Sequence, residues 1–175
     1  ALVYRLVYAR AFEFALLRHW DEIIDTIPSQ SEYVGHALGS SAMHPAKVAK
    51  MLARIAWGHR SMPNALAKSL AIVPQSLAFA RDMQARGVHH MHANWATYPA
   101  TAAMLISELT GIPYSFSGHA TDIFVHHAML REKIESARFV VTCTRFNRGY
   151  LADIAPERAD RIRTVYHGVD LPRFA

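Results

Sequence analysis

Residues 87–119, GVHHMHANWATYPATAAMLISELTGIPYSFSGH, decide the fold class of this 175-residue chain. The apolar segments 88–93 and 112–117 favour strands, and the alanine-rich segment 98–110 between them favours a helix. A strand, a helix and a second strand with short connections are typical of a right-handed βαβ unit in a parallel sheet. Both strands end on polar residues, and ligands bind outside the carboxyl ends of such strands.

The same alternation continues to the end of the chain. Apolar segments predict further strands at 138–143 and 162–167, and the segments before each of them, 127–137 and 144–154, favour helices. Strands that alternate with helices imply a parallel sheet with helical crossovers. The sequence therefore predicts an α/β fold, a Rossmann-like three-layer parallel sheet, built from the βα repeats of residues 87–175.

The first half of the chain is predicted to be mainly helical over residues 1–86, so that residues 1–175 form a single, partial Rossmann-like domain. Helical spacing of apolar residues predicts a helix that Pro28 ends, a basic amphipathic helix, and a third helix that Pro74 divides. The expected ranges are 1–27, 46–57 and 65–86 for the helices and 28–45 for the loop between the first two.

Composition narrows the class of protein without choosing a function. Hydrophobic residues make up 51% of the chain, which excludes a disordered protein. The formal net charge of +5 suits anionic partners such as nucleotide-sugars or phospholipid headgroups, whereas the scattered basic residues do not favour nucleic acid. A lone cysteine, Cys143, excludes an internal disulfide and fits a reducing compartment, so we expect a cytoplasmic protein.

The basic helix at 46–57 allows two interpretations. Lys47, Lys50 and Arg54 lie on one side of it, opposite an apolar stripe. Such a helix can touch an anionic membrane surface, which would place the protein at the inner face of the membrane. It can equally be an ordinary surface helix whose charges are solvated. Both interpretations stay open.

Polar or small residues follow every predicted strand, and parallel strands bring these ends to one rim of the sheet. The sharpest candidate is His119, because Gly118 before it allows a close turn and Asp122 after it can orient the imidazole or cap the next turn. The other candidates on this rim are His92, Asn94, Ser117, Thr142, Thr144, His167, Gly168 and Asp170.

A metal site is the less favoured use of these histidines. His90 and His92 share one face of their strand and could join His119 and Asp122 around an ion. No cysteine or further carboxylate is suitably spaced beside the pair, so we expect no metal. We expect His90 to pack between sheet and helix and His92 to reach the cleft. Glycine-rich phosphate-binding motifs and a Gly-x-Ser-x-Gly elbow are absent from the sequence.

Three segments resemble a known family. They are HMHANWATYPATAAMLISELTGIPYSFSGHATDIF, ARFVVTCTRFNRGYL and IRTVYHGVDLPRF. Together they are similar to the N-terminal, acceptor-side domain of retaining GT-B glycosyltransferases of family 4, in particular the subgroup of exopolysaccharide and colanic-acid-type assembly. The most specific pieces are the His-x-His strand, the turn from Ser117 to Ile123, and Gly168-Val169-Asp170.

The resemblance implies an enzyme with two Rossmann-like domains that face a cleft. The second domain would bind the nucleotide-sugar, and this one would supply the acceptor surface, for a glycan or lipid-linked acceptor, and a histidine near the transferred sugar, which maps to His119. Asp122 matches the acidic residue after that histidine. Gly168 and Asp170 match the crossing into the second domain, although His167 stands where the family commonly has asparagine. The family needs no metal or other cofactor.

The resemblance also implies that this chain is a fragment. A first strand would precede residue 1, which would leave the 88–93 strand with an unpaired edge, and a donor-binding domain would follow residue 175. We expect the fragment alone to be inactive. The alternative function is a non-catalytic module that binds a sugar or an anionic lipid.

Overall fold

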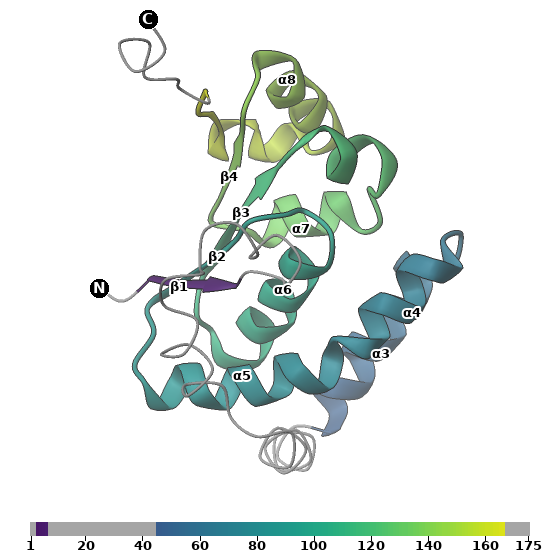
Figure 1. Ribbon diagram of the computed structural model, residues 1–175, viewed down its shortest axis with the longest axis vertical. Helices are drawn as coiled ribbons and strands as arrows, with labels where there is room; N and C mark the ends of the chain where they lie inside the picture. Colours follow the sequence, from purple (N-terminus) through teal and green to yellow (C-terminus); the bar gives the residue numbers. More distant parts are fainter. Residues whose placement is uncertain (1–2, 7–44, 167–175) are drawn as a thin grey trace, which may run out of the picture.

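The computed structural model describes residues 3–6 and 45–166. A five-stranded, all-parallel sheet in the order β1-β2-β3-β4-β5 forms its centre (Figure 1). The strands are β1 (Val3–Leu6), β2 (His90–Ala93), β3 (Tyr114–Gly118), β4 (Phe139–Thr142) and β5 (Ile162–Thr164). The prediction of a Rossmann-like α/β fold with a parallel sheet and a preceding helical segment is thereby confirmed.

The helices follow the predicted alternation closely. The first three, α3 (Pro45–Gly58), α4 (Pro63–Ala71) and α5 (Val73–Ala85), precede β2, and Pro74 in the first turn of α5 marks the predicted division. The crossovers that follow contain α6 (Tyr98–Thr110), the π-helical turn η1 (Thr121–Val125), α7 (Leu130–Ser136), α8 (Arg145–Ile154) and the 3₁₀ turn η2 (Pro156–Arg161). The helix predicted at 127–137 forms as the shorter α7, and the turn at η1, which precedes it, was not predicted.

Local chemistry explains where these helices begin and end. Gly111 ends α6 with a backbone φ of 76°, a left-handed conformation that glycine adopts without a steric penalty. Thr144 caps α8, because its side-chain oxygen accepts a hydrogen bond from the Asn147 N–H. Both residues are the ends that the sequence predicts. None of the described helices is long and apolar enough to cross a bilayer.

The N-terminal prediction is wrong where it can be compared. Residues 3–6 form a strand and not the start of a helix, and β1 pairs in parallel with β2 in the register Val3↔His90 to Leu6↔Ala93. The edge of β2 that we expected to be unpaired therefore has a partner, which supplies the backbone hydrogen bonds that an open edge lacks. Residues 7–44, which include the rest of the predicted helix and the predicted loop, lie outside the described residues. His167, the last residue of the strand predicted at 162–167, also lies outside them.

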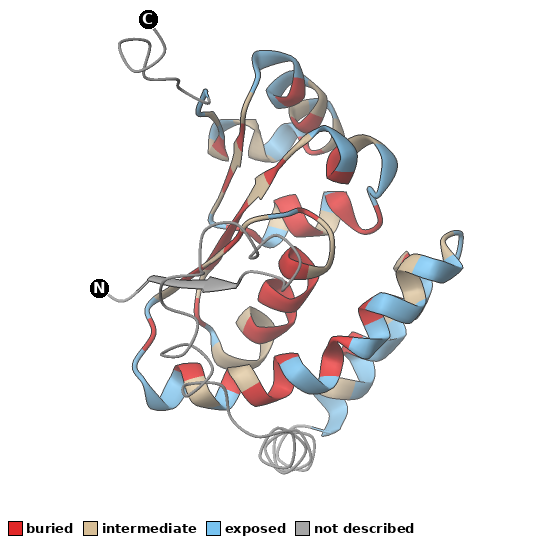
Figure 2. Ribbon diagram, viewed as in Figure 1, coloured by how far each residue is buried: buried red, intermediate tan, exposed pale blue. Residues whose placement is uncertain are grey.

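The two faces of the sheet differ in character. On one face lie the large, fully buried side chains of Met91, Tyr114, Phe116, Val140 and Ile162. Helix α6 contacts β2 and β3 on this face, and α5 and α7 pack against α6 in turn. Figure 2 shows how the buried residues concentrate along α6 and the central strands, while α3 and α4 are largely exposed.

The opposite face is polar near β2 and β3. It carries His90, His92, Ser115 and Ser117, with Phe139 of β4 beside them, because side chains alternate along a strand. Four of these five side chains are half-buried, and only Ser115 is fully buried. The described helices thus cover the apolar face, and the histidine-bearing face is the more accessible one.

Candidate functional site at the carboxyl rim of the sheet

The carboxyl ends of β2 and β3 lie side by side, since the two strands pair in parallel. This pairing brings the loop after β2, which contains Asn94 and Trp95, beside the turn that contains His119. The rings of Trp95 and His119 are 5.0 Å apart between centroids and tilted by 58°. Trp95 is 38% exposed and His119 is half-buried, so the indole is the more accessible of the two rings. The rim predicted from the strand ends therefore forms.

Asp122 joins the two loops of this rim. Its Oδ2 accepts a hydrogen bond from the Ala96 N–H at 2.6 Å, and its Oδ1 accepts one from the His119 N–H at 2.7 Å. The side chain is only 2% exposed. Burial raises the pKa of this carboxyl, while the two backbone N–H groups and His119 act in the opposite direction. The carboxylate thus binds backbone N–H groups of two loops, and the turn that contains it, η1, has no side-chain cap hydrogen bond, so the predicted capping of the next turn is not what the structure shows.

Lys133, on α7, holds the same loop from the other side. Its Nζ donates to the carbonyl oxygens of Ala96 at 2.8 Å, Ala128 at 2.9 Å and Thr97 at 3.2 Å. The residue is 1% exposed, and burial lowers the pKa of Lys133 from its ordinary value of 10.5 to about 7, against the attraction of Asp122 and Glu132. Three carbonyl oxygens match the three N–H donors of an ammonium group.

The peptide groups of Ala96 are therefore fixed at both ends, its N–H by a carboxylate and its C=O by an ammonium group. We refer to Ala96, Asp122 and Lys133 as the Ala96 clamp. The clamp holds the residue next to Trp95 and the backbone of His119, so it helps to position the exposed Trp95 ring and the half-buried His119 ring. Sequence analysis missed Lys133, because a lysine on a short helix is ordinarily solvated and nothing in its spacing marks it as buried.

A second polar cluster runs along the exposed face of the same strands. Ser115 Oγ lies 2.8 Å from His90 Nε2 and 2.8 Å from His92 Nδ1, and His92 Nε2 lies 2.9 Å from Ser117 Oγ. We refer to these four residues as the His–Ser network. It forms a continuous hydrogen-bonded chain that ends at Ser117, next to the rim.

The contacts of His90 that the structure describes lie within the sheet. Its ring stacks on Phe139 of β4 at 5.6 Å between centroids with an interplanar angle of 4°. Burial lowers the pKa of His90, and the nearby Arg138 acts in the same direction. His92 shares one face of β2 with His90, as predicted, and both its ring nitrogens contact serine hydroxyls.

Gly118 owes its identity to packing. A Cβ at this position would come within 2.9 Å of Ile123 Cγ2, and the buried Ile123 side chain has little room to move away from it. The Gly118 carbonyl accepts a hydrogen bond from Thr142 Oγ1 at 2.8 Å, which ties the end of β3 to the end of β4. Gly118 therefore lets the chain pass close to η1 and sets the direction of His119.

The structure thus brings together most of the predicted site residues on neighbouring strand ends. They are His92, Asn94, Ser117, Gly118, His119 and Asp122, and Trp95 is an addition whose only sequence signal is an aromatic residue in a polar loop. Gly168 and Asp170 lie outside the described residues. Within residues 3–6 and 45–166, no three His, Cys, Asp or Glu side chains are grouped as a metal ion would require.

Comparison with known proteins does not add to this geometry. No family model, no curated protein sequence and no solved structure matches the chain. The chemistry of the rim must therefore carry any functional argument. An imidazole and an indole that share one accessible corner can hydrogen-bond a hydroxyl and pack against an apolar ring face at the same time.

Proposed function

We propose that this chain is the N-terminal, acceptor-side domain of a retaining glycosyltransferase that transfers a sugar from a nucleotide-sugar to a glycan or lipid-linked acceptor in polysaccharide biosynthesis. The proposal is supported by the all-parallel sheet and by the accessible histidine at its carboxyl rim. Open parallel sheets bind ligands at this edge. The sequence resemblance to GT-B glycosyltransferases of family 4 motivates the reaction class.

The observation that carries the proposal is the Ala96 clamp beneath the Trp95–His119 pair. Two buried ionic side chains are costly, and here they fix the backbone next to the exposed Trp95 ring and the half-buried His119 ring. A sugar presents hydroxyl groups at its edge and C–H groups on its faces, so it can engage both rings at once. His119 would donate a hydrogen bond to a sugar hydroxyl or disperse the charge that develops on the leaving group.

The remaining rim residues would bind substrate or position those that do. Asn94, half-buried after β2, would offer amide donors and an acceptor to sugar hydroxyls. His92 and Ser117 hydrogen-bond each other, so their contribution would be to orient the Ser117 hydroxyl toward the rim. Gly168 and Asp170 would lie at the crossing into a donor-binding domain, and no metal or cofactor enters the proposal.

A decisive test uses the complete open reading frame that encodes this chain. His119→Ala should lower turnover with a nucleotide-sugar donor by about 100-fold, the scale of losing one donor to developing charge, with little loss of stability. His89→Ala, which removes an exposed histidine just before β2, is the matched control and should leave turnover unchanged. Turnover of His119→Ala within twofold of wild type would remove His119 from the site.

The 175-residue chain alone provides a second test. We expect it to release no nucleotide from a panel of nucleotide-sugars, because the donor pocket would lie in another domain. Robust turnover by this chain would contradict the proposal that the donor pocket lies in another domain.

A non-catalytic module that binds an anionic membrane is the second candidate, and α3 is the feature that favours it. Lys47 and Lys50 are exposed, and so is Trp57 at the end of the helix, with 70% of its surface accessible. Arg54 does not contribute a free charge, since it pairs with Glu108 at 2.6 Å and lies 3.7 Å from Glu132. In this case the protein would sit in the cytoplasm at the inner face of the membrane.

Vesicle co-sedimentation separates the two candidates. A Lys47→Glu, Lys50→Glu variant should lose binding to vesicles that contain anionic lipid, because each basic residue near such a surface contributes about 1 kcal/mol. Binding that is equal on neutral and anionic vesicles, or equal in the variant, would end the membrane interpretation.

A further inference from the structure

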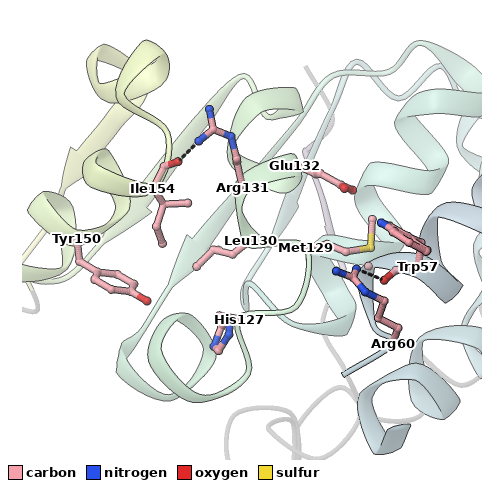
Figure 3. A pocket seen from close by; sticks show the side chains of 10 residues that line it. Trp57, Arg60, His127, Met129, Leu130, Arg131, Glu132, Tyr150 and Ile154 are labelled. Atoms are coloured by element: carbon pink, nitrogen blue, oxygen red, sulfur yellow. Dashed lines mark hydrogen bonds between the residues drawn. The ribbon is translucent and has the colours of Figure 1, made fainter. Parts of the chain in front are cut away.

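A second concave site lies on the helical side of the molecule. The end of α3, the segment before and at the start of α7, and α8 enclose an open pocket of about 460 Å³ (Figure 3). Its size falls within the range of about 300–1,000 Å³ that is usual for small-molecule sites. None of the residues that line it belongs to the carboxyl rim or to the Ala96 clamp, so it is independent of the function proposed above. The lining residues are Trp57, Gly58, Arg60, His127, Met129, Leu130, Arg131, Glu132, Tyr150 and Ile154.

The walls of this pocket are mainly apolar. Met129 and Leu130 are buried, Ile154 and the ring of Tyr150 are half-buried, and Trp57 exposes 70% of its surface at the pocket mouth. Figure 3 shows Tyr150 and Trp57 on opposite sides of the cavity, with Leu130 and Met129 between them. A flat apolar body placed here would contact aromatic rings from two different elements.

The shape of the pocket depends on a close contact at Gly58. A Cβ on Gly58 would overlap the side chain of Met129, so only glycine lets the end of α3 approach this segment. Met129 itself has a φ of 55°, which is unusual for a residue with an unbranched side chain. Both features indicate that this corner is built with a defined geometry.

Among the charged side chains that line the pocket, Arg131 is well paired, Glu132 has only a distant partner and Arg60 has no acidic one. Arg131 is neutralised by Glu135 at 2.7 Å and Glu157 at 3.1 Å, and its Nη1 donates to the Ile154 carbonyl at 2.8 Å. Glu132 lies 3.7 Å from Arg54, which pairs more closely with Glu108 at 2.6 Å, and the buried Oε2 of Glu132 has no hydrogen-bond partner among the described residues. For Arg60, no acidic side chain lies within 4.0 Å in the described part of the chain.

Arg60 is nevertheless held in place. Its guanidinium lies 4.4 Å from the centre of the Trp57 ring, and its Nη1 donates to the Trp57 carbonyl at 2.8 Å. A guanidinium has five N–H donors, so others remain for a ligand. In Figure 3 the group lies beside Trp57 and Met129 at one side of the pocket, and the Tyr150 hydroxyl and the His127 ring lie apart from it toward the other side.

We propose that this pocket binds a small molecule with a flat, apolar body and one anionic group, of the aryl carboxylate or aryl phosphate class. Arg60 pairs with the anionic group, where a guanidinium forms bidentate hydrogen bonds with carboxylate and phosphate oxygens. The rings of Trp57 and Tyr150 and the side chain of Leu130 contact the body.

Two fluorescent probes of similar shape separate the charge from the apolar contact. The probe 1-anilinonaphthalene-8-sulfonate carries an anion, and N-phenyl-1-naphthylamine lacks it. Wild-type protein should bind the anionic probe saturably at one site. Arg60→Gln should weaken that binding about tenfold, because a charge-assisted hydrogen bond is lost, and leave the uncharged probe unaffected. Trp57→Ala should weaken both probes.

Matched controls exclude surface effects. Arg81→Gln makes the same change in net charge on an exposed position of α5 and should alter neither affinity. Phe146→Ala removes an aromatic side chain that is 75% exposed but does not line the pocket, and it too should have no effect. Arg60 and Trp57 are both exposed, so their variants should fold normally, which circular dichroism checks.

Competition with small aryl compounds tests whether the pocket requires an anionic group. Phenyl phosphate or benzoate should displace the anionic probe at lower concentration than benzyl alcohol does, and the better of the two identifies the preferred anion. Equal losses in Arg60→Gln and Arg81→Gln, equal losses in Trp57→Ala and Phe146→Ala, or equal displacement by benzyl alcohol would each overturn the proposal.

Discussion

Two polar clusters are built on the same pair of strands, and they differ in how they use charge. The Ala96 clamp places a carboxylate and an ammonium group in surroundings where they are 2% and 1% exposed, and both bind backbone groups. The His–Ser network consists of two imidazoles and two hydroxyls, three of the four half-buried, that bind one another. The clamp lies beneath the rim, and the network lies along the open face.

The difference shows what each cluster contributes. Burying an ion is costly unless its hydrogen bonds are satisfied. We therefore expect buried ions where they hold loop backbone groups more firmly than neutral side chains would. The clamp joins three segments, the loop after β2, the turn after β3 and the start of α7. Within the part of the chain that the structure describes, the hydrogen bonds of the network join two neighbouring strands that backbone hydrogen bonds already connect. We therefore expect the clamp to dominate stability.

Asp122→Ala should be the most damaging change. It leaves the N–H groups of Ala96 and His119 without their acceptor and removes the anion that attracts Lys133. We expect a loss of about 3 kcal/mol in the free energy of unfolding, measured by urea denaturation. Asp153→Ala, at an exposed position of α8, is the control and should cost little. Similar losses in the two variants would contradict the role of the clamp.

Lys133 should give the protein a characteristic pH dependence. Its pKa is lowered to about 7 in the folded state, so between pH 7 and its ordinary pKa of 10.5 the unfolded state binds more protons. The free energy of unfolding should therefore rise with pH in this window, by at most about 1.4 kcal/mol per pH unit. Urea denaturation at pH values from 7.5 to 9.5, which lie inside this window, measures the rise.

The variant Lys133→Met isolates this contribution. It retains an unbranched apolar side chain but cannot titrate, so the rise with pH should be lost. The window ends below pH 10 because burial raises the pKa of Tyr114, whose folded form then loses stability as the unfolded tyrosine ionises. A slope that survives in Lys133→Met would assign the pH dependence to other groups.

The network should respond more weakly and unevenly. Ser115→Ala removes a buried hydroxyl that two imidazoles contact, so we expect a loss of about 1.5 kcal/mol. Ser117→Ala removes a half-buried hydroxyl whose place water can take, and it should cost about 0.5 kcal/mol. Thermal or urea unfolding compares them. Equal losses in the free energy of unfolding would show that burial does not determine how much each hydroxyl stabilises the fold.

His119→Ala should have the smallest effect on stability. The clamp binds the backbone N–H of residue 119 and not its ring, so the loss should stay below about 0.5 kcal/mol in urea denaturation. A loss comparable with that of Asp122→Ala would mean that the imidazole is part of the fold and would weaken its assignment to substrate.

Much of the fold could be predicted because local chemistry specifies it. The alternation of apolar strands with helices over residues 87–166 predicts the parallel sheet, and Gly111 and Thr144 mark helix ends through their own backbone and side-chain chemistry. The strand at 3–6 could not be predicted from its own pattern, because its conformation follows from pairing with β2 along the sheet edge.

The sequence by itself determined the fold class and the edge of the sheet where polar side chains gather, since both follow from local periodicity and from the parallel direction of the strands. Only the tertiary structure decided the roles within that edge. Lys133 is buried because helix α7 places it under the loop of Ala96, and Asp122 turns to two backbone groups from different loops. Such contacts join residues far apart in the chain, and no local pattern encodes them.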